Sequence, residues 1–119
     1  MVQLINVPFC YYVNLLKEIQ DCLIADKLLY SKHAKDEMEK DESGEINEKE
    51  VYEAVLSGKI IEYYPDDEPY PSCLIYGKTY ENRPLHIVCA YANDSDMAII
   101  ITVYQPTPEK WIDFERRKI

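Results

Sequence analysis

The spacing of apolar residues changes once along the chain, at Gly58. Before this glycine, apolar side chains recur every three or four residues, which is the period of an amphipathic helix. The pattern predicts three helices, over residues 8–26, 31–41 and 47–57, with Pro8 in the first turn of the first helix. After Gly58 the period becomes that of extended chain.

The second and third predicted helices carry capping residues. Ser31 is suited to cap the second helix, and Asn47 is suited to cap the third. Glu50 stands three residues after Asn47 and completes the pattern of a capping box, while Ile46 and Val51 occupy the two positions of a hydrophobic staple. The third helix therefore has the most complete set of helix-start features in this sequence.

Four extended runs rich in Ile, Val and Tyr follow between residues 59 and 104, namely KIIEYY, SCLIYG, LHIVCAY and MAIIITVY. The links between them are short and rich in turn residues, which favours an antiparallel meander over crossover connections. The last two runs are apolar at both alternating positions, which predicts central strands covered on both faces. We therefore expect an α+β protein in which three N-terminal helices pack on a four-stranded antiparallel sheet.

Length and composition predict one globular domain over residues 1–119. A hydrophobic content of 47% excludes wholesale disorder, and the apolar runs are too short to span a bilayer. The N-terminal segment MVQLINVPFCYY lacks the basic region and the cleavage site of a signal peptide. We expect a cytoplasmic protein without membrane association.

The chain contains four cysteines, Cys10, Cys22, Cys73 and Cys89, and none of them forms a CxxC pair. Cys10 and Cys22 are predicted to lie in one helix, roughly 18 Å apart, which is too far for a disulfide bond. Cys73 and Cys89 fall in predicted strands and are best explained as small buried apolar residues. The pattern predicts no structural disulfide, no metal site and no cofactor.

The acidic excess is confined to one stretch of the chain. Of the 22 acidic residues, 13 lie between Asp36 and Glu68, together with only 3 of the 13 basic residues. The net charge of −9 argues against a nucleic-acid partner, but the charges outside this acidic segment nearly balance. The acidic segment is either a set of solvated faces or an interaction surface for a basic partner. We predict that it forms a face separate from the one that carries Lys32, Arg83 and His86.

Two histidines, His33 and His86, are the side chains best suited to acid–base chemistry near neutral pH. Two converging imidazoles could supply a general acid and a general base, and Arg83 beside them would stabilise charge on a phosphate. Tyr104 ends the last predicted strand and offers a phenol. The structural alternative is that His86 is a satisfied strand residue and that His33 organises a helix start. A zinc site built from both histidines and a cysteine is a third alternative, although no ligand pair has the usual spacing.

The segments YSKHAKDEM, EAVLSGKIIEYYPDDEPYPSCLIYG, RPLHIV and IITVY, in this order, resemble the domain of unknown function 4258 family. The resemblance covers about residues 30–104 and divides the chain into three parts. These are an N-terminal helix extension over residues 1–27, a family core over residues 28–104 and a C-terminal tail over residues 105–119. The family in turn resembles the RelE and MqsR group of small bacterial toxins, whose fold places helices against an antiparallel sheet.

This resemblance implies a metal-independent endoribonuclease in a toxin–antitoxin pair, with RNA as substrate and a small zinc-binding antitoxin as partner. His33 matches the histidine of the KHA segment, His86 the histidine before the valine-rich strand, and Tyr104 the tyrosine of the TVY segment. The implied catalytic residues are His33, His86, Arg83 and Tyr104, and the RNA-binding residues are Lys32 and Lys35.

The helix predicted over residues 31–41 departs from the family pattern. Glu37 and Asp41 stand where relatives often have arginines. A ribonuclease of this type depends on cations to hold RNA and to stabilise transition-state charge, so the departure predicts weak or absent catalysis. The alternative function is a non-catalytic protein-interaction domain, in one form a homodimer, whose histidines are structural and whose acidic segment contacts a partner.

Overall fold

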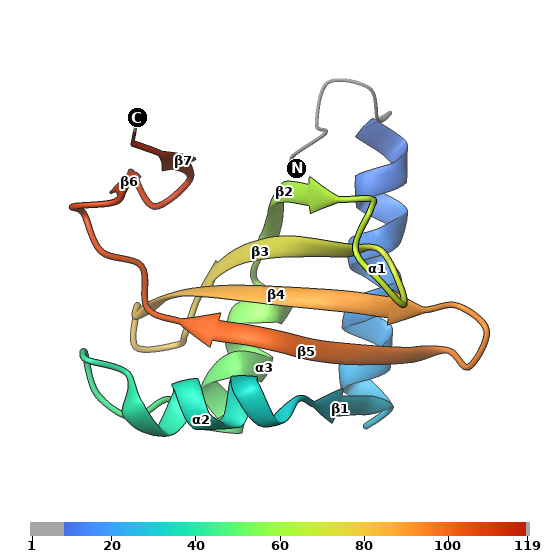
Figure 1. Ribbon diagram of the computed structural model, residues 1–119, viewed down its shortest axis with the longest axis horizontal. Coiled ribbons are helices and arrows are strands. Elements are labelled where there is room, and N and C mark those ends of the chain that lie inside the picture. Colours follow the sequence, from blue (N-terminus) through green and yellow to red (C-terminus); the bar gives the residue numbers. More distant parts are fainter. Residues whose placement is uncertain (1–8, 119) are drawn as a thin grey trace.

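The computed structural model describes residues 9–118, with side chains from Asn14 onward. Its helices are α1 (Phe9–Ile24), α2 (Lys32–Lys40) and α3 (Glu48–Leu56). Its strands are β1 (Leu28–Tyr30), β2 (Lys59–Tyr64), β3 (Ser72–Lys78), β4 (Pro84–Ala92), β5 (Met97–Tyr104), β6 (Trp111–Ile112) and β7 (Arg116–Arg117). Figure 1 shows one sheet, with α2 and β1 along its β5 edge and the chain beyond β5 leaving at one end.

The three predicted helices are confirmed, each within two residues of its expected bounds where these fall in the described chain; Pro8 lies outside it. The Ser31 hydroxyl accepts the backbone N–H of Ala34 at 3.0 Å and caps α2. Asn47 and Glu50 form the predicted capping box, because each side chain accepts the other residue's backbone N–H, at 2.9 and 3.0 Å.

The prediction of a four-stranded antiparallel sheet is wrong, because the sheet has five strands and is mixed, in the order β1-β5-β4-β3-β2. Strands β2 to β5 form the expected antiparallel meander, with β4 and β5 inside the sheet. The additional strand β1 pairs parallel with β5, where Leu28 lies opposite Ala98. A strand of three residues is too short to show an alternating period, which is why the sequence pattern missed it.

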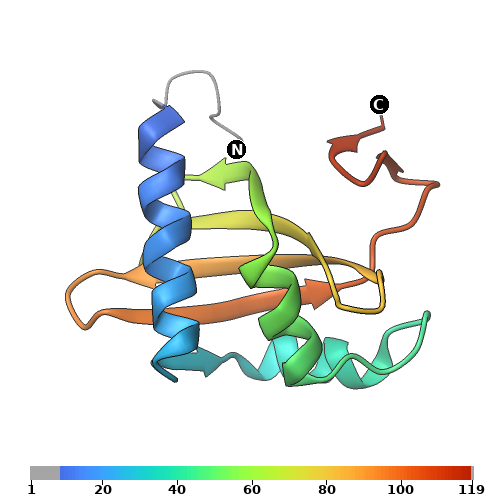
Figure 2. The same cartoon turned by 180° about the vertical axis from the view of Figure 1, so that it is seen from behind.

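Helices α1 and α3 cover one face of the sheet, which Figure 2 shows from the helix side. Apolar side chains from both layers form the core beneath them. Each fully buried isoleucine or leucine contributes roughly 1.5–3 kcal/mol relative to an exposed one. Large, fully buried members of this core are Ile19, Ile46, Ile75, Leu85, Ile87 and Ile100.

The edge of β5 is covered in two different ways along its length. Strand β1 pairs with the first half of β5 and ends at Tyr30. Beyond that point α2 runs beside β5, and two of its carboxylates accept backbone N–H groups of the strand edge. Glu37 accepts from Val103 and Asp41 accepts from Gln105, both at 3.1 Å. Side chains four residues apart on a helix lie on one face, so they can match N–H groups two residues apart on a strand.

The three cysteines whose side chains are described, Cys22, Cys73 and Cys89, are buried free thiols. This agrees with the prediction for the two strand cysteines; the side chain of Cys10 lies outside the described part. Within residues 9–118, every helix is too short or too polar to span a lipid bilayer.

Helix α3 packs against β3 without room for a side chain at Gly77. A Cβ atom on Gly77 would lie 1.8 Å from the backbone carbonyl oxygen of Ala54. Because this neighbour is helix backbone and not a flexible side chain, it cannot give way without moving α3.

We expect Gly77→Ala to lower the free energy of unfolding by about 3 kcal/mol or more, because the whole helix must shift away from the core. Urea denaturation followed by circular dichroism measures this. The matched control is Lys49→Ala on the exposed side of α3, which should stay within about 0.5 kcal/mol of the parent. A Gly77→Ala protein as stable as the control would contradict the close approach.

Candidate functional site

A row of polar and aromatic side chains crosses the sheet at one end. Lys59 of β2 pairs with Tyr76 of β3, Tyr76 pairs with His86 of β4, and His86 pairs with Tyr104 of β5. Neighbouring strand residues such as Ile87 belong to the core under α1 and α3. Because side chains alternate between faces along a strand, the row projects from the opposite face. There it meets residues 106–118, which we call the strap.

His86 is fully buried, and both of its ring nitrogens have partners. Its Nε2 lies 2.6 Å from the backbone carbonyl oxygen of Phe114 in the strap, and its Nδ1 lies 3.0 Å from the Tyr104 hydroxyl. Since a carbonyl oxygen can only accept, Nε2 carries the hydrogen and Nδ1 accepts the hydroxyl hydrogen of Tyr104. His86 is therefore a neutral imidazole between a phenol and the strap.

Rings enclose the His86 imidazole. Trp111 stands edge-on at 4.4 Å between ring centroids, and Tyr104 and Tyr76 lie at 5.2 and 5.7 Å. Burial among these rings lowers the pKa of His86 to about 4, although the hydrogen bond to Phe114 acts in the opposite direction. Burial also raises the pKa of Tyr104 to about 12. Both groups are thus uncharged at neutral pH.

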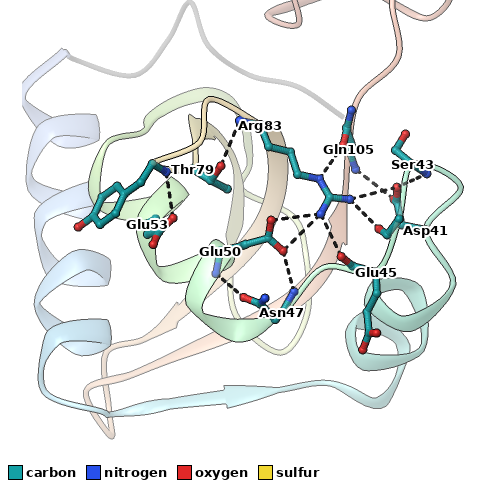
Figure 3. A network of polar contacts seen from close by, with 11 residues as sticks. Asp41, Ser43, Glu45, Asn47, Glu50, Glu53, Thr79, Arg83 and Gln105 are labelled. Carbon is teal, nitrogen blue, oxygen red and sulfur yellow. Dashed lines mark hydrogen bonds and ion pairs between the residues drawn. The ribbon is translucent and has the colours of Figure 1, made fainter.

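Arg83 lies in the turn between β3 and β4, directly before β4, and its guanidinium is directed into the protein (Figure 3). Its partners are Gln105 Oε1 at 2.7 Å, the carbonyl oxygens of Gly44 at 2.6 Å and Glu45 at 3.0 Å, and the carboxylates of Glu50 at 3.2 Å and Asp41 at 3.8 Å. These contacts use all three guanidinium nitrogens, so Arg83 presents no free fork for a phosphate.

The expected separation between the acidic segment and Arg83 is wrong. Asp41 and Glu50 both belong to that segment and both pair with Arg83. Glu53 of the same segment is also buried, where it accepts the backbone N–H of Tyr80 at 2.9 Å. Several of the acidic residues thus satisfy internal donors and do not form a solvated face.

His33 lies on α2 with 65% of its side chain exposed, and its Nε2 lies 3.3 Å from a carboxylate oxygen of Glu37. It lines a cleft of about 360 Å³ whose walls are His33, Asp36, Glu37, Lys40, Asp41, Glu42 and Tyr104. The structure therefore brings Tyr104 next to both histidines, since it shares this cleft with His33 and is hydrogen-bonded to His86.

A larger cleft of about 730 Å³ lies between the loop after α2 and the strap. Its lining consists of Asp41, Glu42, Ser43, Tyr104, Gln105, Pro106, Thr107, Glu109, Lys110, Trp111, Arg117 and Lys118. Asp41, Glu42 and Tyr104 line both clefts. The loop after α2 contributes Asp41 and Glu42 to the larger cleft, whereas the strap contributes three basic residues and one acidic residue, Glu109.

The two lysines predicted to bind RNA lie on the exposed side of α2 and pair with carboxylates. Lys32 contacts Asp36 at 2.9 Å, and Lys35 lies 3.9 Å from Glu48. Exposed pairs of this kind are weak, so both ammonium groups can leave their partners. Their neighbouring side chains are nevertheless carboxylates, those of Asp36 and Glu48.

Sequence reasoning missed the polar contact that holds the strap. Arg117 donates two hydrogen bonds to Glu62, at 2.8 and 3.0 Å, and its guanidinium lies 4.7 Å from the centre of the Trp111 ring. Two features of the sequence could have indicated it. Glu62 is a lone carboxylate inside the apolar run KIIEYY, and the tail WIDFERR combines two aromatic residues with four charged ones.

Among residues 9–118, no three His, Cys, Asp or Glu side chains are grouped so that they could hold a metal ion. The alternative of a zinc site from both histidines and a cysteine therefore has no ligand cluster in the described chain.

The fold and the site define a small α+β protein whose mixed sheet carries a buried imidazole, hydrogen-bonded to a half-buried phenol, under a C-terminal strap. Residues 30–105 match the family described as a domain of unknown function (DUF4258), and the chain belongs to this family. No curated protein and no solved structure matches the chain. The family match ends at Gln105, so the strap lies beyond it.

Replacing Arg83 tests its role at this end of the sheet. We expect Arg83→Lys to lower the free energy of unfolding by about 2–3 kcal/mol, because an ammonium group keeps the charge but cannot reach the same set of acceptors. Chemical denaturation measures the loss. Arg116→Lys, at an exposed strap position, is the control and should be neutral. Equal stabilities of the two variants would show that the Arg83 contacts carry little weight.

The buried neutral His86 predicts a pH dependence of stability. Its folded-state pKa of about 4 lies below the ordinary value of 6.5. Between these two pH values the imidazole is protonated in the unfolded chain and neutral in the folded chain. Stability should therefore fall with pH from 6.5 towards 4, by about 2 kcal/mol between pH 7 and pH 5 from this group alone. His86→Gln should lose less over that interval, measured by urea denaturation at both pH values. His33→Gln, at the exposed histidine, is the control, and its loss of stability between the two pH values should match that of the parent. An equal loss in His86→Gln and in the parent would contradict the assignment of His86 as a buried neutral imidazole.

Proposed function

We propose that this chain is a RelE/MqsR-like component of a toxin–antitoxin pair that acts by binding a protein partner and not by cleaving RNA. Membership of the family and the resemblance of its core segments to such toxins support the first part of the proposal. The burial of His86 and the internal contacts of Arg83 support the second part.

The observation that carries this proposal is the state of Arg83. A metal-independent ribonuclease needs a cation at the scissile phosphate, because negative charge grows there in the transition state. The Arg83 guanidinium is held by carbonyl and carboxylate oxygens of the α2–α3 loop and α3, as well as by Gln105. Releasing it for a phosphate would break contacts on all three of its nitrogens at the same time, which is costly.

Charge at the clefts favours a protein partner over RNA. The smaller cleft is lined by four acidic residues, Asp36, Glu37, Asp41 and Glu42, against Lys40 and the His33 imidazole. Such a surface repels phosphates and favours basic side chains. The partner class we propose is a small antitoxin, zinc-binding as in related pairs, that presents a basic segment.

A second candidate function is weak RNA cleavage, and one observation favours it. His33 is exposed, is oriented by Glu37 and shares a cleft with Tyr104. In this arrangement His33 would act as general base on a ribose hydroxyl, and Lys40 in the same cleft would be the cation. His86 would act only through Tyr104, since it has no exposed surface.

One experiment separates the two functions. We expect the purified chain to cleave mixed-sequence RNA no faster than a buffer control, and we expect His33→Ala to leave that rate unchanged. The reason is that the Arg83 guanidinium and the His86 imidazole are not available to a substrate. A cleavage rate that falls by roughly 10²–10⁴-fold in His33→Ala, the usual worth of general acid–base catalysis, would establish the second function instead.

The binding arm uses a candidate antitoxin of the proposed class, a small zinc-binding protein with a basic segment, co-expressed and co-purified with this chain. We expect a complex that weakens as salt concentration rises, and that weakens further with Glu42→Lys at the shared wall of the two clefts. The matched control is Glu81→Lys, an exposed carboxylate in the β3–β4 turn. A salt-independent complex, or equal effects of the two substitutions, would contradict binding at the clefts.

A further inference from the structure

The strap is joined to the rest of the protein by side chains and not by sheet pairing. Its two short strands, β6 and β7, form a sheet of their own. Its other backbone–backbone hydrogen bonds in the described chain also join strap residues to one another, as between Lys118 and Lys110 at 2.9 Å. A two-stranded hairpin is at best marginally stable alone, so the strap depends on its contacts with the main sheet.

Those contacts are made by side chains, and they include the packing of Phe114 against Tyr76 at 6.4 Å between ring centroids. Trp111 packs against the His86 ring, the Phe114 carbonyl accepts from His86, and Arg117 forms its two bonds to Glu62. The Arg117–Glu62 pair is the strongest polar contact among them, because it is bidentate and the Glu62 side chain is only 9% exposed. The remaining ion pair, Lys59 to Glu115, is solvent-exposed and therefore weak.

The strap adopts a strained backbone where it meets His86. Asp113 and Phe114 both have left-handed φ angles, of 54° and 61°. Two such residues form the turn of a tight hairpin, a position that glycine and asparagine occupy at lower cost than phenylalanine. Strain of this kind persists only while surrounding contacts impose it, and it clusters at binding and switch regions. The strain here keeps the Phe114 carbonyl directed at His86.

The chain just before the strap is fixed. The Gln105 backbone N–H donates to Asp41, and its side-chain oxygen accepts from Arg83. Residue 105 thus marks the end of the chain that is fixed to the sheet edge before the strap begins.

We propose that residues 106–118 form a cover that opens and recloses over the His86–Tyr104 pair, with the Arg117–Glu62 contact as its latch. Opening removes one wall of the 730 Å³ cleft and leaves the His86 Nε2–H without the Phe114 carbonyl. The uncovered site then presents an imidazole N–H beside a phenol, and a ligand oxygen can take the place of that carbonyl. This inference goes beyond the proposed function and does not depend on it.

The two histidines of the chain make the opening measurable. Diethyl pyrocarbonate modifies exposed imidazoles, and mass spectrometry of the intact, folded protein after digestion assigns the modification to each histidine. His33, which is 65% exposed, is the internal reference, and His86 is fully buried in the closed form. We expect Arg117→Gln to raise the modification rate of His86 by about tenfold and to leave His33 unchanged, because it removes a charge-assisted bidentate contact.

Glu62→Gln breaks the latch from the other side and should give the same increase. Arg116→Gln, at the neighbouring exposed position, is the matched control and should give none. Circular dichroism shows that each variant remains folded, and the His33 rate corrects for differences in reagent concentration. In the parent, the His86 rate should exceed the rate that global unfolding allows, because local opening is cheaper than global unfolding. If the His86 rate equals the global unfolding rate in the parent and in both latch variants, the strap is a fixed part of the fold and the proposal is overturned.

Discussion

The organisation of this end of the molecule depends on one guanidinium group. Arg83 binds the loop after α2, the first turn of α3 and the residue that follows β5, three segments far apart in the sequence. A planar fork with five N–H donors can serve more acceptors at once than any other side chain. The clefts and the anchor of the strap are positioned around it. Arg83 is therefore a structural residue whose guanidinium is bound by acceptors of this same chain.

This arrangement changes what the candidate catalytic residues can do. The sheet gathers Tyr104 and His86 into one hydrogen-bonded pair, but the strap covers that pair and burial keeps both groups neutral. His33 remains accessible among carboxylates. A site with a covered imidazole and an internally engaged arginine is better suited to holding a partner than to cleaving a phosphodiester bond, and we propose the binding function on that basis.

The sequence predicted what local patterns determine. The capping box of Asn47 and Glu50 and the change of period at Gly58 located helices and meander strands within about two residues. It did not reveal contacts between distant segments, because the position of a charged residue in the sequence does not identify the residue with which it pairs. Glu50 reads equally as a solvated helix residue and as the ligand of Arg83, and Glu62 gives no indication that it binds Arg117. The parallel strand β1 was missed for a related reason, since its pairing with β5 depends on tertiary placement and not on a local period.

The carboxylates of α2 have a consequence for how this protein can change over evolutionary time. Glu37 and Asp41 accept backbone N–H groups of Val103 and Gln105 at the edge of β5. Exchanging either one for a cation would replace a backbone hydrogen bond by an unpaired donor facing a positive charge. A basic cleft at this place would thus require a new cover for the sheet edge at the same time, so each single substitution towards it is unfavourable.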